Sequence, residues 1–311
     1  MLFRGESMEP QEINKGRKIN PGEKTPRRRP VYPISAEREL ARAAVGYVTM
    51  AIKVCQSFVA DMMRLYEEPE EFRTDDIGDF ITGVRGKRRA AADRLSEKTG
   101  ALRKLEKEVG RSGNLAMKHS IDDWNDQVVD ALGQEIVKSD YEDSMRQMVD
   151  SWIHQNVSQI SSIPSDYMSK VEDIIRWGYE THQPKVNVYR RLEKLEGMTK
   201  AQARMIARDQ LGTLNSQMTR HEHESMGISK YKWITRRDRR VRDCHRMLHG
   251  KVFSWSEPPA MWYSTKSRGI VYTGRYCHPG EDICCRCTAS PVFDLEGAVM
   301  LLRRHFRGEE L

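Results

Sequence analysis

Apolar residues recur every three or four positions along most of the chain as far as Gly227, which is the spacing of one face of an α-helix. The first helix is expected to begin near Ser35 and to end before Pro69. Its apolar stripe consists of Leu40, Ala44, Tyr47, Ala51, Val54, Phe58, Met62 and Leu65. A stripe this regular is typical of a helix that packs in a core or against another helix.

Two further helical stretches are expected before residue 160. The stretch 88–109 is strongly charged, so we expect it to be exposed or to lie on a partner. Gly110 and Gly113 predict a hinge after it. The stretch 121–159 again carries apolar residues at helical spacing.

Proline, glycine and threonine punctuate the chain between residues 160 and 227. Pro164 is expected to open a helix that runs to Gly178. A shorter helix is expected to end near Gly197. Thr199 and Gln202 have the spacing of a capping box, in which each side chain bonds a free backbone N–H group, and predict a new helix that ends at Gly227.

The pattern changes after Gly227, where short aromatic runs alternate with turn residues, as in short strands joined by loops. We therefore predict an α+β protein with a mainly helical N-terminal half and a small mixed α/β C-terminal domain. The expected regions are an arm that is disordered or extended until it meets a partner, a helical region, a helical connector, a C-terminal domain and a basic helix or tail. The arm spans residues 1–33, the helical region 34–115, the helical connector 116–155, the C-terminal domain 156–295 and the basic helix or tail 296–311.

Positive charge is concentrated just after Gly227. The chain has a net charge of +7, and residues 229–251 alone hold nine Lys or Arg and two Asp. Such a segment suits the phosphates of double-stranded DNA, bound without sequence preference through Lys230, Lys232, Arg236, Arg237, Arg239, Arg240 and Arg242. The arm residues Arg27–Arg29 would assist, and the stretch 85–107 is the other candidate for DNA contact. A solvated face, or a contact with an acidic protein surface, is the alternative interpretation.

Five of the six cysteines lie between Cys244 and Cys287, near several histidines. His245 and His249 share a face if they lie on a helical turn, and Cys285 and Cys287 share a face if they lie on a strand. Two such pairs can hold zinc, which binds nitrogen and sulfur ligands in a tetrahedron. The alternative is a set of reduced thiols, with the long loop before Cys284 closed by aromatic packing. A zinc ion, if present, is expected to be structural.

The sequence does not favour an enzyme. It contains no phosphate-binding GxxxxGK[ST] loop, no GxSxG motif, no GxGxxG motif and no HExxH motif. No run of about 18 apolar residues occurs, so we predict no membrane span and no membrane partner. The first residues lack the apolar middle of a signal peptide, and a reducing compartment is therefore expected.

Several motifs in residues 155–295 resemble one protein family. They are the run from Ala203 to Asn215, the segment from Gly227 to Trp233, the segment from Asp238 to His245 followed by Leu248 to Phe253, and the Pro279-Gly280 pair before Cys285-Arg-Cys287. Their order and spacing resemble the Mu F-like phage head morphogenesis family of minor head proteins. Residues 1–150 show no comparable resemblance.

The resemblance implies a virion component of a tailed bacteriophage, present in few copies and associated with the portal protein during procapsid assembly in the host cytoplasm. It also implies a place in the capsid interior near the portal, possible contact with the major capsid or scaffold protein, and DNA binding in some members. The histidine and the Cys-Arg-Cys motif of the family correspond to His245, Cys285 and Cys287. Cys244, Cys277 and Cys284 depart from the family's pattern, so the fourth ligand stays open. Cys244 and His278 are the favoured candidates, with His249 behind them.

Two other functions remain open at this stage: a metal-dependent nuclease or other DNA-processing enzyme encoded by a phage, and a DNA-binding regulator that does not enter the virion. An acid-rich or open metal centre would favour the enzyme. We place the portal contact, as a hypothesis, on the N-terminal half, because the stripe from Leu40 to Leu65 offers more apolar surface than a small domain needs.

Overall fold

A computed structural model describes residues 16–67, 77–97, 99–133, 141–181, 183–267 and 269–294. The expected tail at 296–311 and the first fifteen residues of the expected arm lie outside these ranges. The chain folds into two compact units. Unit 1 comprises the described residues within Met1–Ile34, Asn114–Val149 and Asp209–Leu311, and unit 2 those within Ser35–Gly113 and Asp150–Arg208. The units interleave along the chain, whereas the regions expected from the sequence follow one another.

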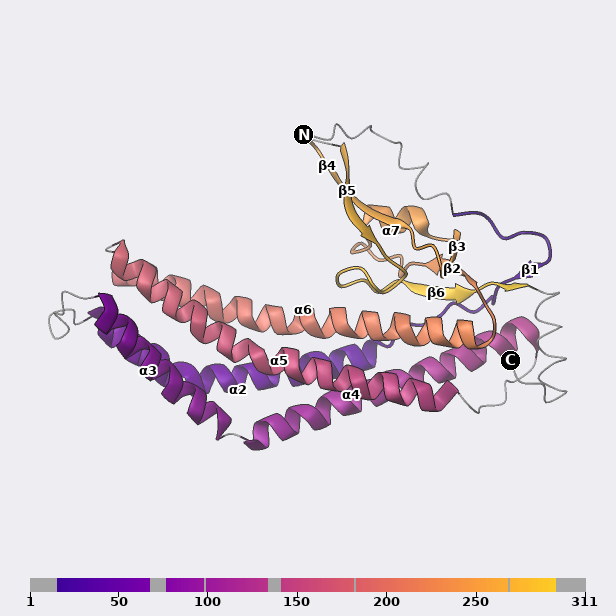
Figure 1. Cartoon of the computed structure of the whole chain (residues 1–311). Coiled ribbons are helices and arrows are strands. Elements are labelled where there is room, and N and C mark those ends of the chain that lie inside the picture. The colour runs from indigo at the N-terminus through magenta and orange to yellow at the C-terminus, as the bar shows by residue number, and fades with distance from the viewer. Residues whose placement is uncertain are drawn as a thin grey trace. The chain divides into compact units, whose positions relative to one another are not determined.

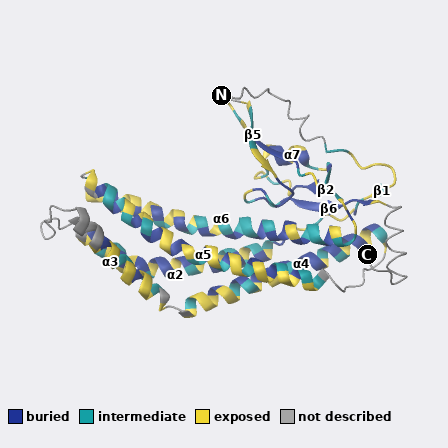
Figure 2. Cartoon of the chain, in the orientation of Figure 1, coloured by how far each residue is buried: buried dark blue, intermediate teal, exposed yellow. Residues whose placement is uncertain are grey.

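Unit 2 is built from five helical segments. They are α2 (Ile34–Glu67), α3 (Ile77–Ser96), the first part of α4 (Thr99–Leu132), the last part of α5 (Tyr141–Glu180) and the first part of α6 (Lys185–Ser225). Figure 1 shows these helices in their order along the chain. Buried and exposed positions alternate along each helix at helical spacing (Figure 2), so the expected amphipathic pattern is what packs unit 2.

Five residues of the apolar stripe of α2 lie in the core of unit 2. Leu40, Ala44, Ala51, Phe58 and Met62 are all at most 1% exposed. By length and composition alone, the stretch Ile34–Arg64 could cross a membrane, although the sequence contains no run of 18 apolar residues. Burial of this face inside unit 2 accounts for its apolar composition. That the protein has no membrane partner stays a prediction.

Three expected helix boundaries are wrong. Gly110 and Gly113 lie inside α4, Pro164 lies inside α5, and Thr199 lies inside α6. The Thr199 hydroxyl donates to the carbonyl oxygen of Leu195 at 2.8 Å, a bond back along the same helix rather than a cap. The apolar faces continue through these positions, because tertiary burial outweighs the local cost of a glycine or proline.

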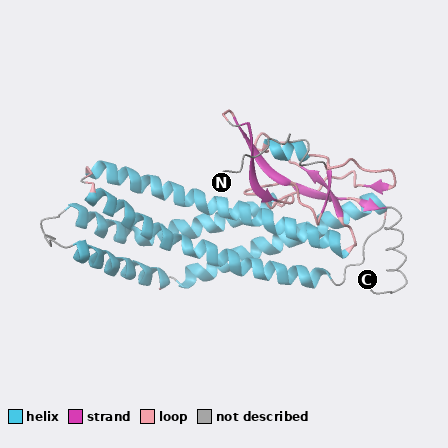
Figure 3. Ribbon diagram, turned by 45° about the horizontal axis from the view of Figure 1, so that its top comes forward, coloured by secondary structure: helices cyan, strands magenta, loops and turns pink. Residues whose placement is uncertain are grey.

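Unit 1 contains the strands (Figure 3). β2 (Lys230–Ile234) lies between β3 (Val252–Ser254) and β6 (Thr288–Pro291) in an antiparallel sheet, and β4 (Ala260–Thr265) pairs with β5 (Gly269–Tyr276) in a hairpin. The short helix α7 (Asp243–Leu248) follows β2. The α+β class is confirmed, and these strands begin after Gly227 as predicted.

Residues 16–33 of the expected arm are largely extended and ordered by contacts within unit 1, so the expectation of disorder is wrong for them. β1 (Glu23–Lys24) pairs with β7 (Phe293–Asp294), and the backbone of Arg17 exchanges hydrogen bonds of 3.2 and 2.9 Å with Val252. The Asp130 carboxylate accepts the backbone N–H groups of Arg27 and Arg28. Backbone pairing of this kind orders a proline-rich segment that has few apolar side chains of its own.

An aromatic and cysteine-rich core holds unit 1 together. Its buried residues are Tyr231, Trp233, Cys244, Leu248, Trp255, Met261, Trp262, Cys277, Cys285, Cys287 and Ala289. Four of the five cysteines of the cluster found in the sequence are therefore core residues, and aromatic rings surround them. A second group, around Trp124, Val128 and Phe293, packs the end of α4 against β7.

The backbone of α6 touches the segment that carries the two cysteines of the Cys-Arg-Cys motif, residues 277–287, which we call the ligand loop. A Cβ atom at Gly212 would lie 2.8 Å from the carbonyl oxygen of Cys285 and 3.0 Å from that of Gly280. Gly280 itself has φ +96° and approaches the carbonyl oxygen of Gly212. Only glycine allows this approach, because any side chain would displace backbone atoms.

We expect Gly212→Ala to lower the free energy of unfolding by about 1–3 kcal/mol, because the new methyl group must push the ligand loop away. The control is Gly197→Ala in the same helix, where a Cβ meets nothing within 4 Å. Alanine is the better helix former, so this control should stabilise the protein by about 0.5–1 kcal/mol. Denaturant unfolding measures both, and equal effects at the two positions would rule out the close contact.

Candidate metal centre

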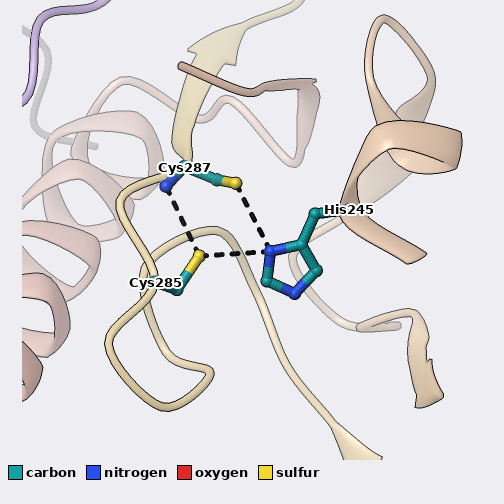
Figure 4. A group of neighbouring side chains, drawn as sticks. All are labelled: His245, Cys285 and Cys287. Atoms are coloured by element: carbon teal, nitrogen blue, oxygen red, sulfur yellow. Dashed lines mark hydrogen bonds between the residues drawn. The ribbon is translucent and has the colours of Figure 1, made fainter. Parts of the chain in front are cut away.

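His245, Cys285 and Cys287 lie together in the core of unit 1 (Figure 4). His245 is on α7, and the two cysteines are on the ligand loop, just before β6. The His245 Nδ1 atom is 3.6 Å from each of the two Sγ atoms, and the three potential ligand atoms lie within 4.8 Å of one another. All three residues are at most 4% exposed.

These distances fit a zinc ion. Zn–S bonds of about 2.3 Å and Zn–N bonds of about 2.0–2.1 Å place sulfur and nitrogen about 3.6 Å apart across one edge of a tetrahedron. Both Sγ–Nδ1 distances have this value. The group can therefore hold a metal with little movement of its side chains.

The electrostatics of the two thiols also suit a cation. The hydrogen bond with Cys287, and after it the one with His245, holds the pKa of Cys285 well below its ordinary value despite burial. The same bond with Cys285, together with burial, raises the pKa of Cys287. One thiolate is thus already favoured at Cys285, and thiolates are the form in which cysteine binds a metal.

The other ring nitrogen of His245 faces a carboxylate. His245 Nε2 is 3.2 Å from Asp282 Oδ2. Burial alone would lower the pKa of His245, but its interactions with Asp282, Cys244 and Cys285 outweigh burial and raise the pKa to about 11. The sequence analysis missed Asp282 as part of this group, and its only signal was an acid three residues before Cys285.

Asp282 is itself held by two arginines. Arg242 Nη1 lies 2.8 Å from Oδ2, and Arg275 Nη2 lies 2.8 Å from Oδ1. The Asp282 side chain is 3% exposed. Burial would raise the pKa of Asp282, but His245 and the two arginines outweigh it and lower the pKa.

Among the described residues, none of the three candidates for a fourth ligand belongs to the group of atoms within 4.8 Å of one another. Cys244 is buried in the same core and directly precedes His245 on α7. His278 lies elsewhere in that core, with its Nδ1 atom 2.9 Å from the Tyr231 hydroxyl and its ring against Trp255. His249 is hydrogen-bonded to Thr235 and Arg237, outside the group.

Four of the seven basic residues expected to contact DNA have partners within the protein. Lys230 pairs with Glu23, and Lys232 donates to the Thr25 hydroxyl. Arg242 pairs with Asp282, and Arg237 donates to His249. The remaining three, Arg236, Arg239 and Arg240, are exposed, and their side chains have no hydrogen bond or ion pair among the described residues.

The arrangement favours a closed site. Cys285, His245 and Asp282 stand in the order of a nucleophile, a base and an orienting acid. However, each of them is at most 4% exposed, so the sulfur does not face a substrate. A closed group with nitrogen and sulfur ligands is typical of a structural metal site.

Comparison with known proteins places these residues in a family. Residues 170–290 match the family described as "Phage Mu protein F like protein". An uncharacterized protein of Haemophilus influenzae is 34% identical over 139 residues, which are 45% of this chain and 28% of that protein. The chain thus matches less than a third of that relative's length, and no solved structure shows a significant match. The matched residues 170–290 include His245, Cys285 and Cys287, so the similarity to the Phage Mu protein F-like family covers the metal-ligand group.

Proposed function

We propose that the protein is a minor head protein of a tailed bacteriophage, which joins the portal protein during procapsid assembly and enters the virion. The family match over residues 170–290 carries this proposal. The matched segment contains the whole metal-ligand group and the exposed arginines, so the family relationship covers the residues with the most specific chemistry.

A structural role suits the closed centre better than an enzymatic one. A catalytic zinc ion keeps an open position for water, whereas all three candidate ligands here are buried. Proteins of this family are generally structural. Reproducible cleavage of plasmid DNA with magnesium, manganese or zinc, abolished by His245→Ala, would contradict this proposal and favour a nuclease.

The portal contact on the N-terminal half stays a hypothesis. Five residues of the α2 stripe that suggested it are buried within unit 2. Exposed apolar side chains of unit 2 lie instead on α4 and α6, at Leu102, Val186, Tyr189, Met198 and Met205. The family relationship, rather than the stripe, is what supports a portal partner.

The first test is the composition of the virion. We expect mass spectrometry of purified particles to detect the full chain in a few copies per particle. A minor head protein that acts at the portal should also be present in procapsids isolated before DNA packaging. Its absence from both kinds of particle, with expression confirmed in the infected cell, would leave a phage regulator as the better explanation.

We propose that the metal is a structural zinc ion bound by His245, Cys285, Cys287 and, as the fourth ligand, Cys244. The geometry of the first three fits the zinc tetrahedron, and Cys244 is a buried thiol of the same core that directly precedes His245 on α7. The ion would join α7 to the ligand loop across the long segment between them. Such a cross-link lowers the entropy of the unfolded chain in a compartment where a disulfide is not expected.

We expect the protein purified without added metal to contain about one zinc ion per chain. Cys285→Ser with Cys287→Ser should remove the zinc and lower the melting temperature, because the ligand loop loses its cross-link. Cys244→Ser should also lose zinc. The control is Cys277→Ser, a buried cysteine of the same core that lies outside the group. Elemental analysis and thermal unfolding measure both effects.

Aromatic packing is the competing explanation for how the loop is closed. In that case the wild-type protein would contain little zinc, and the double variant would be as stable to heat as the wild type. Zinc retained by Cys244→Ser but lost on replacement of His278 by alanine would move the fourth ligand to His278.

We also propose that Arg236, Arg239 and Arg240 contact DNA phosphates. They lie on the exposed segment between β2 and α7, and no acidic partner neutralises them among the described residues. The structure offers no base-reading motif in this segment, so binding is expected to be independent of sequence and to weaken with salt.

Charge reversal of these three arginines to glutamate should reduce the slope of log K against log salt by about 2–3, since each phosphate contact contributes about 0.9. The matched control reverses Arg85, Arg89 and Arg103, three exposed arginines of α3 and α4, with the same change in net charge. Fluorescence anisotropy with duplex DNA at several salt concentrations measures the slope. A loss of slope in the control instead would place the contact on α3 and α4.

A further inference from the structure

The two ring nitrogens of His245 face different groups. Nδ1 faces the two sulfurs, each at 3.6 Å, and Nε2 faces Asp282 Oδ2 at 3.2 Å. A histidine that binds a metal through Nδ1 must carry its proton on Nε2. A carboxylate that accepts this Nε2–H group fixes both the tautomer and the orientation of the ring.

Two arginines fix the position of the Asp282 carboxylate. Each of its oxygens lies 2.8 Å from an arginine, Oδ2 from Arg242 and Oδ1 from Arg275. These two ion pairs hold the carboxylate on the Nε2 side of the ring, away from the nitrogen that faces the sulfurs. Asp282 is therefore placed to orient a ligand, and it is not part of the ligand group itself.

The carboxylate also connects three segments of the chain. Arg242 directly precedes α7, which carries His245, and Arg275 lies on β5. Asp282 lies on the ligand loop, three residues before Cys285. The position of His245 relative to the sulfurs thus depends on a contact between α7 and the loop that supplies the other ligands.

We propose that Asp282 is the positioning residue of the metal centre, and that Arg242 and Arg275 brace it. This inference rests on the proposed metal site. The other explanation of the same contacts is that Asp282 only ties β5 and α7 to the ligand loop, with no influence on the metal. The two explanations differ in what happens to His245 when the charge is removed.

The test compares Asp282→Asn with the wild-type full-length chain in a competition between the protein and a chelator for zinc. We expect the affinity for zinc to fall by about 10–100-fold, as for other outer-shell partners of metal-bound histidines. The control is Glu224→Gln, which removes an exposed ion pair with Arg220 on α6 and touches no residue of the metal-ligand group. Its affinity should stay within about twofold of the wild type, a range set by ordinary surface ion pairs.

The histidine ring gives a second readout, which a purely structural contact would not change. In the zinc-loaded wild-type protein, nitrogen NMR should show His245 bound through Nδ1 and protonated at Nε2. Asp282→Asn should speed exchange of the Nε2–H proton with water. Glu224→Gln should leave this exchange unchanged.

Arg275→Gln provides a variant that does not remove the buried acid, in case Asp282→Asn fails to fold. The Arg275 side chain is 43% exposed, so its replacement leaves the core intact. We expect a smaller loss of zinc affinity in the same direction, with Arg246→Gln, which breaks a surface pair with Asp243, as its control.

The outcomes separate the two proposals. A wild-type protein that binds no zinc would overturn the metal site, and the positioning role with it. Zinc bound equally well by the wild type, Asp282→Asn and Arg275→Gln would overturn the positioning role alone.

Discussion

Unit 1 depends on how the ligand loop is held in place, because this loop has only one aliphatic side chain. That residue, Ile283, is 50% exposed. Buried cysteines hold the loop in the core, and polar and backbone contacts add to them: Asp209 accepts the Cys284 N–H group at 2.7 Å, Gly280 lies against Gly212, and Asp282 pairs with two arginines. A metal ion on Cys285 and Cys287 would add the strongest of these restraints.

The three candidate metal ligands could be predicted from the sequence, whereas the residues that hold them in position could not. His245, Cys285 and Cys287 stand out because few residue types bind zinc and the Cys-Arg-Cys spacing is unusual. Asp282 and Arg275 belong to types that are common on any surface. Their role depends on which segments meet in space, and spacing along the chain does not contain that information. The sequence could not decide between Cys244 and His278 as the fourth ligand for the same reason, because that choice also depends on which segments meet in space.

In the fold, too, the features that depend on local sequence pattern were predicted correctly, and those that depend on tertiary contacts were not. Helical spacing and the change of pattern after Gly227 predict the α+β class correctly. The expected breaks at Gly110, Pro164 and Thr199 are wrong because the apolar faces of α4, α5 and α6 continue through them. β1 could not be predicted either. Two residues of a proline-rich segment form a strand only because β7, about 270 residues later, offers its edge.

Ion pairs connect the basic segment between β2 and α7 to the ligand loop. Asp238 pairs with Arg286, which stands between Cys285 and Cys287, and Arg242 pairs with Asp282. Arg239 and Arg240 lie between these two connections, and Arg236 lies just before them. The two ion pairs join the segment between β2 and α7 to the ligand loop, and Arg236, Arg239 and Arg240 are exposed on that segment. Of the large positive excess after Gly227, part neutralises buried or neighbouring acids, and only the remainder is available to a polyanion.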